Sequence, residues 1–456
     1  MRCARIVVAA SALVVAGASA AGSFPLSGDY GVLPPGTDFN EDALERPVEL
    51  FKSEVAGGKR SYFLDLGDMA FNAPALFGGP ARQAGVSCGS CHVNGASNAK
   101  LYIPGLSTRP GNFDTTGALF NPKADNGLLD PLTPPSLRGA RFLGPYGHDG
   151  RSASLRDFVR AVIVNEFAGP EPSPEILDAL VVYIEEIDFL PNPRLDAEGR
   201  LGKNASEAER RGEMLFFKPF PRDASMSCAA CHIPSAAFVD HRQHDVGSGG
   251  LFKTPTLRNA NFNAPYFHDG RFDTYEQVVD YFDGEFSLGL TAKDKTDLVA
   301  YLNAAGDGER GYEPARVAIE LDELGRFLAV LDTALPARDA AAVALTVDTV
   351  GRELRELTEI FPERKNTAVP EGKAERAKAR GVLKELVLTL RRIEEQTSQG
   401  RFDEARIFLS EYRRELAEAR PIFEAAEPFS LFNPAIRKAH FAALVELTKP
   451  GEVAAR

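Results

Sequence analysis

The chain has 456 residues, a length that accommodates roughly two to four domains of ~100–200 residues each. Its 44% hydrophobic and 25% charged residues are ordinary for globular protein and exclude a wholly disordered or fibrous chain. The 52 Lys and Arg against 64 Asp and Glu leave a net charge of −12. That balance argues against nucleic-acid binding, which rests largely on neutralising phosphates, and would suit a basic protein partner.

The N-terminus has the pattern of an export signal. Arg2 and Arg5 flank the start of an apolar run from Ile6 to Ala16, and Ala18-Ser19-Ala20 supplies a small-residue cleavage site. The apolar run is shorter than the ~20 residues that a membrane helix needs. We therefore expect a signal peptide over residues 1–20, whose removal takes Cys3 with it. The mature chain is expected in the bacterial periplasm without a membrane span.

The four remaining cysteines form two CxxCH motifs, Cys88-Gly89-Ser90-Cys91-His92 and Cys228-Ala229-Ala230-Cys231-His232. This is the attachment motif of c-type haem, because two thiols on one helical turn can add to the two vinyl groups of a porphyrin. The histidine that follows then binds the iron. A redox CxxC needs no histidine, and this set suits two haems better than one zinc ion. The sequence thus predicts two covalent haems with His92 and His232 as axial iron ligands.

A long repeat accompanies the two motifs. Residues 135–151 read PSLRGARFLGPYGHDGR and residues 255–271 read PTLRNANFNAPYFHDGR, with 11 of 17 positions identical. A tandem repeat of this length predicts two similar domains, over residues 21–195 and 196–312. The first unit carries a longer loop between Val93 and Pro134, rich in Gly, Pro and Asn, which we expect to cover a haem edge.

Periodic apolar residues predict helices between the motifs, and Ser206 with Glu209 predicts a capping box at the start of one of them. The expected helices in the two units cover residues 155–165, 173–187, 206–217, 275–282 and 291–303. From about residue 313 proline becomes scarce and charged, Leu-rich segments predict an amphipathic helical bundle over residues 313–456. Its segments cover residues 317–335, 339–360, 375–396, 402–425 and 435–447. Its single histidine, His440, is expected to be a surface or core residue. The predicted fold is mainly α: two tandem cytochrome c-like domains followed by the bundle.

The second repeat block, PTLRNANFNAPYFHDGRFDTYEQVVDYF from Pro255, resembles the bacterial di-haem cytochrome c peroxidase and MauG family. The segment from Phe238 to Gly247 resembles the family's continuation of the second haem motif. The resemblance covers about residues 61–304 and leaves out the predicted bundle. It implies that the N-terminal haem reacts with peroxide while the C-terminal haem stores or relays an electron.

The chain departs from the family pattern at several positions. His148 stands where the first domain of the family usually has a Trp between the haems, and the chain contains no Trp. Phe158 stands where the family has a Gln beside the peroxide site. The expected Glu falls at Ala168, with Glu166 near enough to substitute. The second-domain ligand position, often Met or Tyr, falls at Phe282 next to Tyr281, and Met214 and Met226 are poorly placed to replace it.

These comparisons make His148 and Glu166 the candidate catalytic residues. His148 could bridge the haems, which we favour, or bind the first iron, or be a structural turn residue. His268 is expected to be structural, with Asp149 and Asp269 capping the helices that follow. Arg138 and Arg258, and also Arg151 and Arg271, are candidates to pair with haem propionates, since guanidinium groups match carboxylates. His241 and His244 could be loop residues or lie at a haem edge.

Two functions follow from these features. The favoured one is a peroxidase-type oxidoreductase that takes hydrogen peroxide and electrons from a small redox protein. The alternative is a di-haem electron-transfer protein, supported by the missing Trp and Gln. A haem-based sensor or docking protein has no positive motif.

Overall fold

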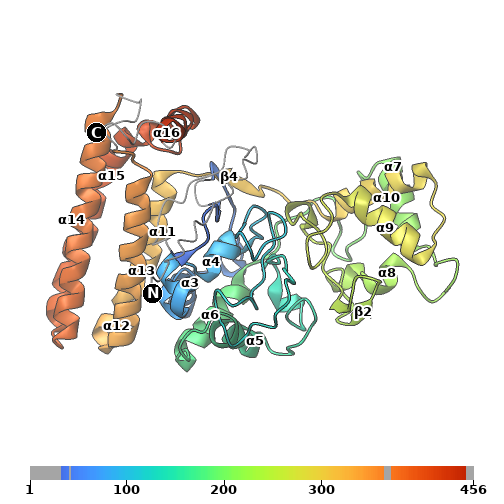
Figure 1. Cartoon of the computed structure of the whole chain (residues 1–456), viewed down its shortest axis with the longest axis horizontal. Helices are drawn as coiled ribbons and strands as arrows, with labels where there is room; N and C mark the ends of the chain where they lie inside the picture. The colour runs from blue at the N-terminus through green and yellow to red at the C-terminus, as the bar shows by residue number, and fades with distance from the viewer. Residues whose placement is uncertain (1–31, 41–42, 364–370, 448–456) are drawn as a thin grey trace, which may run out of the picture.

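The computed structural model describes residues 32–40, 43–363 and 371–447, with side chains to residue 443. The expected signal peptide lies outside these residues. The described chain is elongated, with the first CxxCH motif in the middle, the second at one end and the long C-terminal helices at the other (Figure 1). Its elements are mostly helices, which confirms the mainly α fold class.

The helices around the first motif are short and connected by long loops. They are α1 (Lys52–Val55), α2 (Tyr62–Phe71), α3 (Gly79–Ala84), α4 (Cys88–Cys91), α5 (Leu155–Ala161) and α6 (Pro174–Glu186), with a π-helical segment Val162–Glu166 after α5. The helices around the second motif are α7 (Glu207–Phe217), α8 (Cys228–Cys231), α9 (Tyr275–Phe286) and α10 (Ala292–Ala305). Four short strands, β1 (Glu45–Pro47), β2 (Gln243–Asp245), β3 (Leu251–Lys253) and β4 (Tyr312–Pro314), form two antiparallel pairs, β1 with β4 and β2 with β3.

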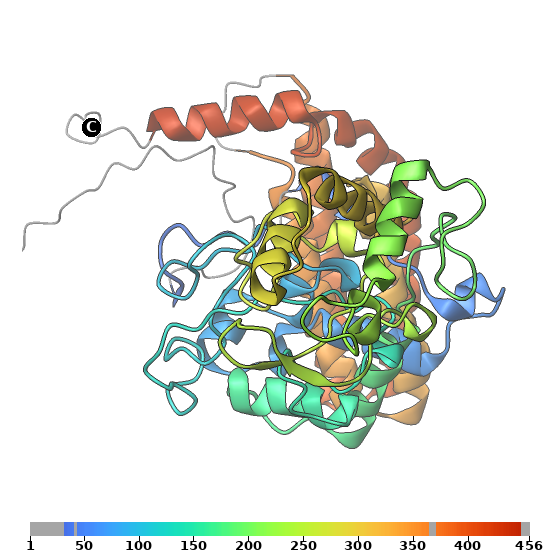
Figure 2. The ribbon, with the colours of Figure 1, turned by 90° about the vertical axis from the view of Figure 1, so that its right-hand side faces the viewer.

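The C-terminal helices are longer and pack on one another. They are α11 (Val317–Ala329), α12 (Leu331–Ala337), α13 (Ala340–Glu359), α14 (Lys373–Ser398), α15 (Phe402–Ala426) and α16 (Pro434–Leu447). Figure 2, which looks from the end that carries the second motif, shows α16 projecting across the top of the molecule. Five apolar residues that recur at heptad-like spacing along α13 are buried in the core between the helices: Val343, Val347, Val350, Leu354 and Leu357.

A pair of crossing helices forms the centre of each haem-motif unit. α2 crosses α6 where Gly67 lies against the carbonyl of Ala179, and α7 crosses α10 where Gly212 lies against the carbonyl of Asp297. A side chain at either glycine would overlap that carbonyl, so both crossings require glycine. The repeat seen in the sequence therefore extends to a repeated helix crossing.

The C-terminal helices share a core with the first unit. Leu66 and Met69 of α2 and Ala179 of α6 are fully buried in one cluster with apolar side chains of α11, α13, α14 and α15. The β1–β4 pair adds a second link, because it joins residues 45–47 to residues 312–314. The domain limits placed at residues 195 and 312 stay a prediction.

The expected helices are present, with differences at their ends. Ser206 and Glu209 form the expected capping box. The predicted helix 155–165 becomes π-helical after Ala161, and 317–335 is divided into α11 and α12. The prediction that Asp149 and Asp269 cap helices was wrong: Ser154 and Thr274 are the caps, and the two aspartates accept hydrogen bonds from Arg151 and Arg271 within their own turns.

Candidate haem sites

Each CxxCH motif forms a single helical turn. α4 and α8 begin after Ser87 and Ser227, whose side chains cap them. The i, i+3 spacing within such a turn places both sulfurs of a motif on one side. Cys88, Cys91, Cys228 and Cys231 are all free of disulfide bonds. Both turns therefore present a pair of thiols as the attachment chemistry requires.

The histidine after each turn is oriented by a hydrogen bond between its Nδ1 and a backbone carbonyl. Nδ1 of His92 lies 2.9 Å from the carbonyl oxygen of Pro135, and Nδ1 of His232 lies 3.2 Å from that of Phe238. A carbonyl can only accept, so Nδ1 carries the proton and Nε2 keeps its lone pair. Burial lowers the pKa of His92 to about 4 and lowers that of His232, which favours the neutral imidazole that binds a metal.

An aromatic pair supports each histidine. The ring of Phe71 lies 6.5 Å from that of His92 and 4.9 Å from that of Tyr183. In the second unit Phe216 lies 6.4 Å from His232 and 4.9 Å from Tyr301. The two candidate haem ligands are thus backed by the same arrangement of side chains.

The two candidate propionate arginines have unused donors. Arg138 is only 2% exposed, yet its Nε and Nη1 have no hydrogen-bond partner, and Nε of Arg258 also lacks one. Burial lowers the pKa of Arg138 to about 10, since no carboxylate pairs with it among the described residues. Buried guanidinium N–H groups without acceptors fit the carboxylates of a haem. The thiols, imidazoles and guanidinium groups in place are thus the set that two haems require.

The HDGR turns are held reciprocally by the opposite unit. Nε2 of His148 donates to the carbonyl of Thr133 at 2.7 Å, and the amide of Thr133 donates to the carbonyl of His268 at 2.8 Å. In return, the Lys253 amide donates to the carbonyl of His148 at 2.8 Å, and the Gln243 side chain donates to the carbonyl of Asp149. The long first-unit loop therefore contacts the second HDGR turn, where it joins the two units.

The hydrogen bond of His148 indicates whether its ring can bind an iron. Because its Nε2 donates to a carbonyl, that nitrogen is not available to an iron. His148 is half-buried, and burial lowers its pKa to about 4, so the ring is neutral. His268 stacks on Phe252 at 3.7 Å. The contact chain His148–Thr133–His268 places the two repeat histidines on one path between the units.

Glu166 lies in the π-helical segment after α5. Its Oε1 accepts a hydrogen bond from Nη2 of Arg151 at 2.6 Å, and the same guanidinium lies over the ring of Phe158 at 5.0 Å. Arg151 also pairs with Asp149 at 3.1 Å. Glu166, Arg151 and the HDGR turn of the first unit therefore form one cluster. Ala168 lies outside it, as an exposed residue of the next loop with positive φ.

In the second unit the family's ligand position is aromatic. The hydroxyl of Tyr281 donates to the carbonyl of Val246 at 2.7 Å, and Phe282 stacks on Phe286 at 5.9 Å. Met214 is 66% exposed on α7.

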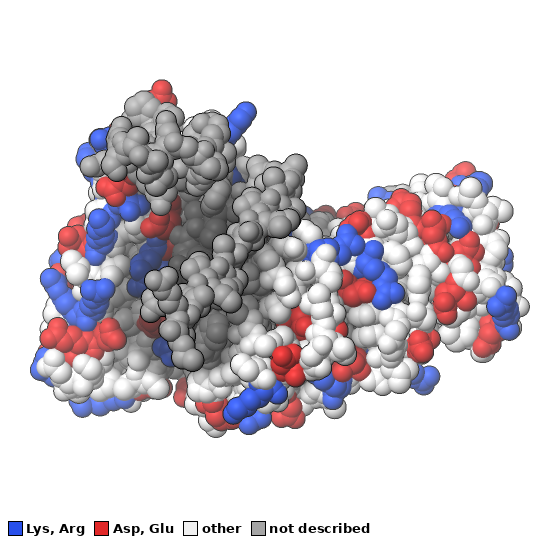
Figure 3. Space-filling model, in the orientation of Figure 1, with Lys and Arg blue, Asp and Glu red and all other residues white. Residues whose placement is uncertain are grey.

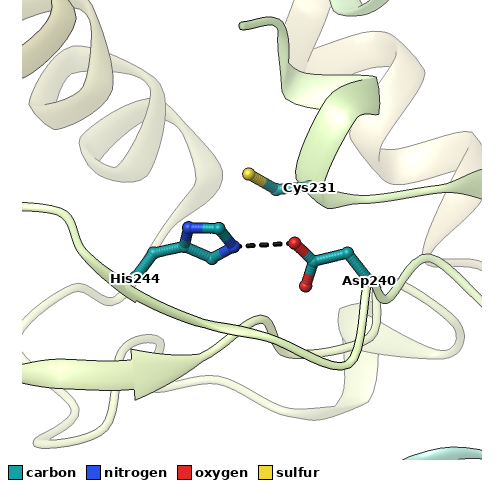
Figure 4. A group of neighbouring side chains, drawn as sticks. All are labelled: Cys231, Asp240 and His244. Carbon is teal, nitrogen blue, oxygen red and sulfur yellow. Dashed lines mark hydrogen bonds and ion pairs between the residues drawn. The ribbon is translucent and has the colours of Figure 1, made fainter.

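The remaining histidines of the second unit have polar partners. Nε2 of His244 lies 2.7 Å from Oδ2 of Asp240, beside the sulfur of Cys231 (Figure 4). Burial alone would raise the pKa of Asp240, but hydrogen bonds from His244 and Thr254 hold it below its usual value. Because Cys231 belongs to the haem motif, the pair is left with too few ligands for a metal of its own. His241 lies 2.7 Å from the carbonyl of Gly144 and so joins the two units.

The comparisons with known proteins agree with this site. A family model described as di-haem cytochrome c peroxidase matches residues 206–309. The methylamine utilization protein MauG of Methylorubrum extorquens is 30% identical over 300 residues, which cover 52% of this chain and 76% of that protein. The chain belongs to the di-haem cytochrome c peroxidase and MauG family.

Other relatives cover similar shares. Hydrazine synthase subunit gamma of Kuenenia stuttgartiensis is 28% identical over 326 residues, which cover 58% of this chain and 83% of that subunit. Cytochrome c551 peroxidase of Nitrosomonas europaea is 23% identical over 277 residues, covering 52% and 77%. Family membership confirms an oxidoreductase that carries two c-type haems with iron.

The surface and the helices add two observations. On the face seen in Figure 3, acidic and basic side chains are interspersed over the described residues, without a field of one sign. No helix of the described chain is long and apolar enough to cross a membrane.

Sequence reasoning missed three residues of these sites. Lys253 joins the units through its side chain as well, because Nζ donates to the carbonyls of Leu143 and Pro145 at 2.8 Å each. Thr133 and Tyr183 are the others. Of the three, the sequence pointed to Tyr183 alone. Residues Leu180–Ile184 weakly resemble Leu298–Leu302, and this second, weaker repeat aligns Tyr183 with Tyr301.

Proposed function

We propose that this protein is a periplasmic peroxidase-type oxidoreductase built from two tandem cytochrome c-like domains and a C-terminal helical bundle. In this proposal His92 and His232 bind the irons, Cys88, Cys91, Cys228 and Cys231 attach the haems, and Arg138 and Arg258 pair with propionates. The first haem is the peroxide site, and the second relays electrons from a small redox protein. The observation that carries the proposal is that each HDGR turn accepts hydrogen bonds from the other unit, so that the two haem units are in direct contact.

When bound, the first haem supplies the iron that reacts with hydrogen peroxide, and the chain supplies the groups around it. Glu166 is the candidate acid–base group, because a positioned carboxylate can accept a peroxide proton and return it to the departing oxygen. Arg151 positions that carboxylate through the 2.6 Å hydrogen bond. Phe158 stands at the position of the family's Gln, so an apolar ring takes the place of a polar side chain beside this cluster.

His148 has a different role in this proposal. Its hydrogen bond to Thr133 and the contact of Thr133 with His268 provide a bonded path between the units. We infer that His148 replaces the family's inter-haem Trp as a bridging residue rather than as an iron ligand.

The alternative is an electron-transfer protein without peroxidase activity. Phe158 supports it, because an apolar ring replaces a polar side chain beside the proposed peroxide site. The basic partner suggested by the net charge suits either function.

A turnover assay separates the two functions. The holoprotein is mixed with a reduced small c-type cytochrome, and oxidation of that donor is followed with and without hydrogen peroxide. We expect peroxide-dependent turnover that falls by about 10²–10⁴-fold in Glu166→Gln, the range for loss of an acid–base group. Glu171→Gln is the matched control, since Glu171 pairs with Arg160 on the surface. Donor oxidation without any response to peroxide would favour the electron carrier.

A further inference from the structure

A network of charged side chains lies where the C-terminal helices meet the first haem unit. Arg46 pairs with Glu320 at 3.0 Å and Glu323 at 2.9 Å, both on α11. Arg60, just before α2, pairs with Asp65 at 2.7 Å and with Asp68 at 2.6 Å, both on α2. Arg326 of α11 reaches both sets, at 3.4 Å from Asp68 and 3.8 Å from Glu323. Carboxylates outnumber arginines in this network.

Glu49 lies beside this network and has a tyrosine, not a cation, as its hydrogen-bond partner. It accepts a hydrogen bond from the hydroxyl of Tyr183 on α6, and no ion pair of Glu49 with Lys or Arg occurs among the described residues. The side chain of Asp68 is nearly inaccessible, with 2% exposed. The charged groups that act on these two carboxyls come from each surrounding element: Arg46, Arg60, Arg138, Glu323 and Arg326. Glu320 and Glu353 act on the network from α11 and α13.

Two short paths connect Glu49 to the first haem site. Nη2 of Arg138, the candidate propionate ligand, donates to the carbonyl of Val48 at 2.9 Å, directly beside Glu49 in the chain. On the other side, Tyr183 packs on Phe71, which packs on His92. Glu49 therefore lies close to groups on two sides of the candidate haem site without contacting an iron ligand itself.

Burial and crowding favour the protonated carboxyl here. Burial and the nearby Asp68 carboxylate raise the pKa of Glu49, and burial raises that of Asp68 despite Arg60 and Arg326. Each carboxyl therefore makes ionisation of the other less favourable. A further negative charge at the haem would raise both pKa values again, since charges interact strongly where water is excluded.

The second unit lacks the hydrogen bond between tyrosine and carboxyl. The hydroxyl of Tyr301, the counterpart of Tyr183, has no hydrogen-bond partner among the described residues. Glu213, which occupies the position of Asp68 one residue after the crossing glycine, pairs with Arg200 at 2.8 Å. The second haem site thus has the same aromatic support, but its tyrosine bonds no carboxyl.

We propose that Glu49, coupled to Asp68, is a proton-binding site linked to the redox state of the first haem. When a one-electron donor reduces that haem, the Glu49 carboxylate takes a proton from water and becomes a carboxylic acid, and reoxidation releases the proton. The proton offsets the added negative charge. The C-terminal helices take part, because α11 supplies Glu323 and Arg326. The proposal rests on haem binding and not on peroxide chemistry.

Spectroelectrochemical titration of the holoprotein between pH 5 and 9, without peroxide, tests this proposal. The haems are assigned with the variant Cys228→Ala/Cys231→Ala, which retains the first haem. We expect the reduction equilibrium constant of the first haem to fall by up to tenfold per pH unit, about 59 mV for one electron, while that of the second changes little. Glu49→Gln should abolish the dependence. Tyr183→Phe should shift its midpoint, and the matched control Tyr301→Phe should not.

Two outcomes would overturn the proposal: equal pH dependence of both haems, or an unchanged dependence in Glu49→Gln. If Glu49→Gln does not fold, reduced-minus-oxidised infrared spectra of the unmodified protein decide the question. They should show a carboxylic acid C=O band gained on reduction, and its absence would refute protonation of Glu49. Because peroxide is never added, failure here leaves the proposed peroxidase function untouched.

Discussion

The two crossing helix pairs, α2 with α6 and α7 with α10, share an inner face. Gly67 and Gly212 allow the same close approach, and the paired aromatic residues lie behind each candidate iron ligand at matching distances. These side chains face the interior in both units. The two units therefore support their candidate haem ligands in the same way.

The outer faces differ because the C-terminal helices cover one, whereas the other carries an ion pair whose arginine is 38% exposed. Counting from the crossing glycines, Leu66 corresponds to Arg211, and Ala179 corresponds to Asp297. Leu66 and Ala179 are fully buried under the C-terminal helices. Arg211 and Asp297 instead form an ion pair at 2.7 Å. One fold thus presents an apolar docking face in one unit and a charged face in the other.

The largest expected difference is loss of a haem from one unit alone. Cys88→Ala/Cys91→Ala should remove the first haem, and Cys228→Ala/Cys231→Ala should remove the second, because each motif holds its own porphyrin. Mass spectrometry of denatured protein should find two haems in the unmodified chain and one in each variant. One haem in the unmodified chain, or haem extractable by acid acetone, would contradict the paired-unit account.

An exchange of outer-face residues tests the covered surface. Leu66→Arg places an unpaired charge in the shared core and should destabilise the protein by about 3–5 kcal/mol, as broken buried pairs do. Arg211→Leu should cost less, because Arg211 is 38% exposed and Lys293 still pairs with Asp297 at 2.7 Å. Urea unfolding of both variants measures the contrast. Equal losses would show that the C-terminal helices do not distinguish the two faces.

The repeat histidines provide a smaller contrast. His148→Phe should keep the resting spin state and slow electron transfer between haems, because it removes the hydrogen bond to Thr133. His268→Phe should slow transfer less, since its ring is held by stacking on Phe252. Flash photolysis or pulse reduction measures the rate. A resting first haem that changes from low-spin to high-spin in His148→Phe would identify His148 as an iron ligand, and no change in either property would leave it a turn residue.

The smallest expected effect is a loss of thermal stability at acid pH that comes from Asp297 in the second unit. Hydrogen bonds from Arg211 and Lys293 lower the pKa of Asp297 from its ordinary value to about 2. The ionised Asp297 carboxylate therefore stabilises the fold at pH values above the ordinary carboxyl pKa. This stabilisation is lost as the pH falls from about 4 towards 2. Thermal melts over that range should show a weaker dependence in Asp297→Asn. The same slope in both proteins would exclude Asp297 as the source.

Local patterns predicted the haem motifs and most helices, because these depend on residues close in sequence, whereas the candidates His148 and Glu166 came from the family resemblance. The Ser206–Glu209 capping box is one example. Contacts between distant segments could not be predicted. Glu49 appears as an ordinary acidic residue in the sequence, and only the fold brings it to Tyr183 and the C-terminal helices. The same applies to Lys253 and Thr133, whose roles depend on how the units meet.

The peroxide reaction of the half-reduced protein tests the central claim, that the two haem units have different roles, most directly. Electron paramagnetic resonance of the half-reduced holoprotein, before and after rapid mixing with hydrogen peroxide, follows each haem separately. The account predicts that the first haem is high-spin in this state and reacts rapidly, while the second stays low-spin and supplies the electron. Two low-spin haems that are inert to peroxide in every redox state would contradict it.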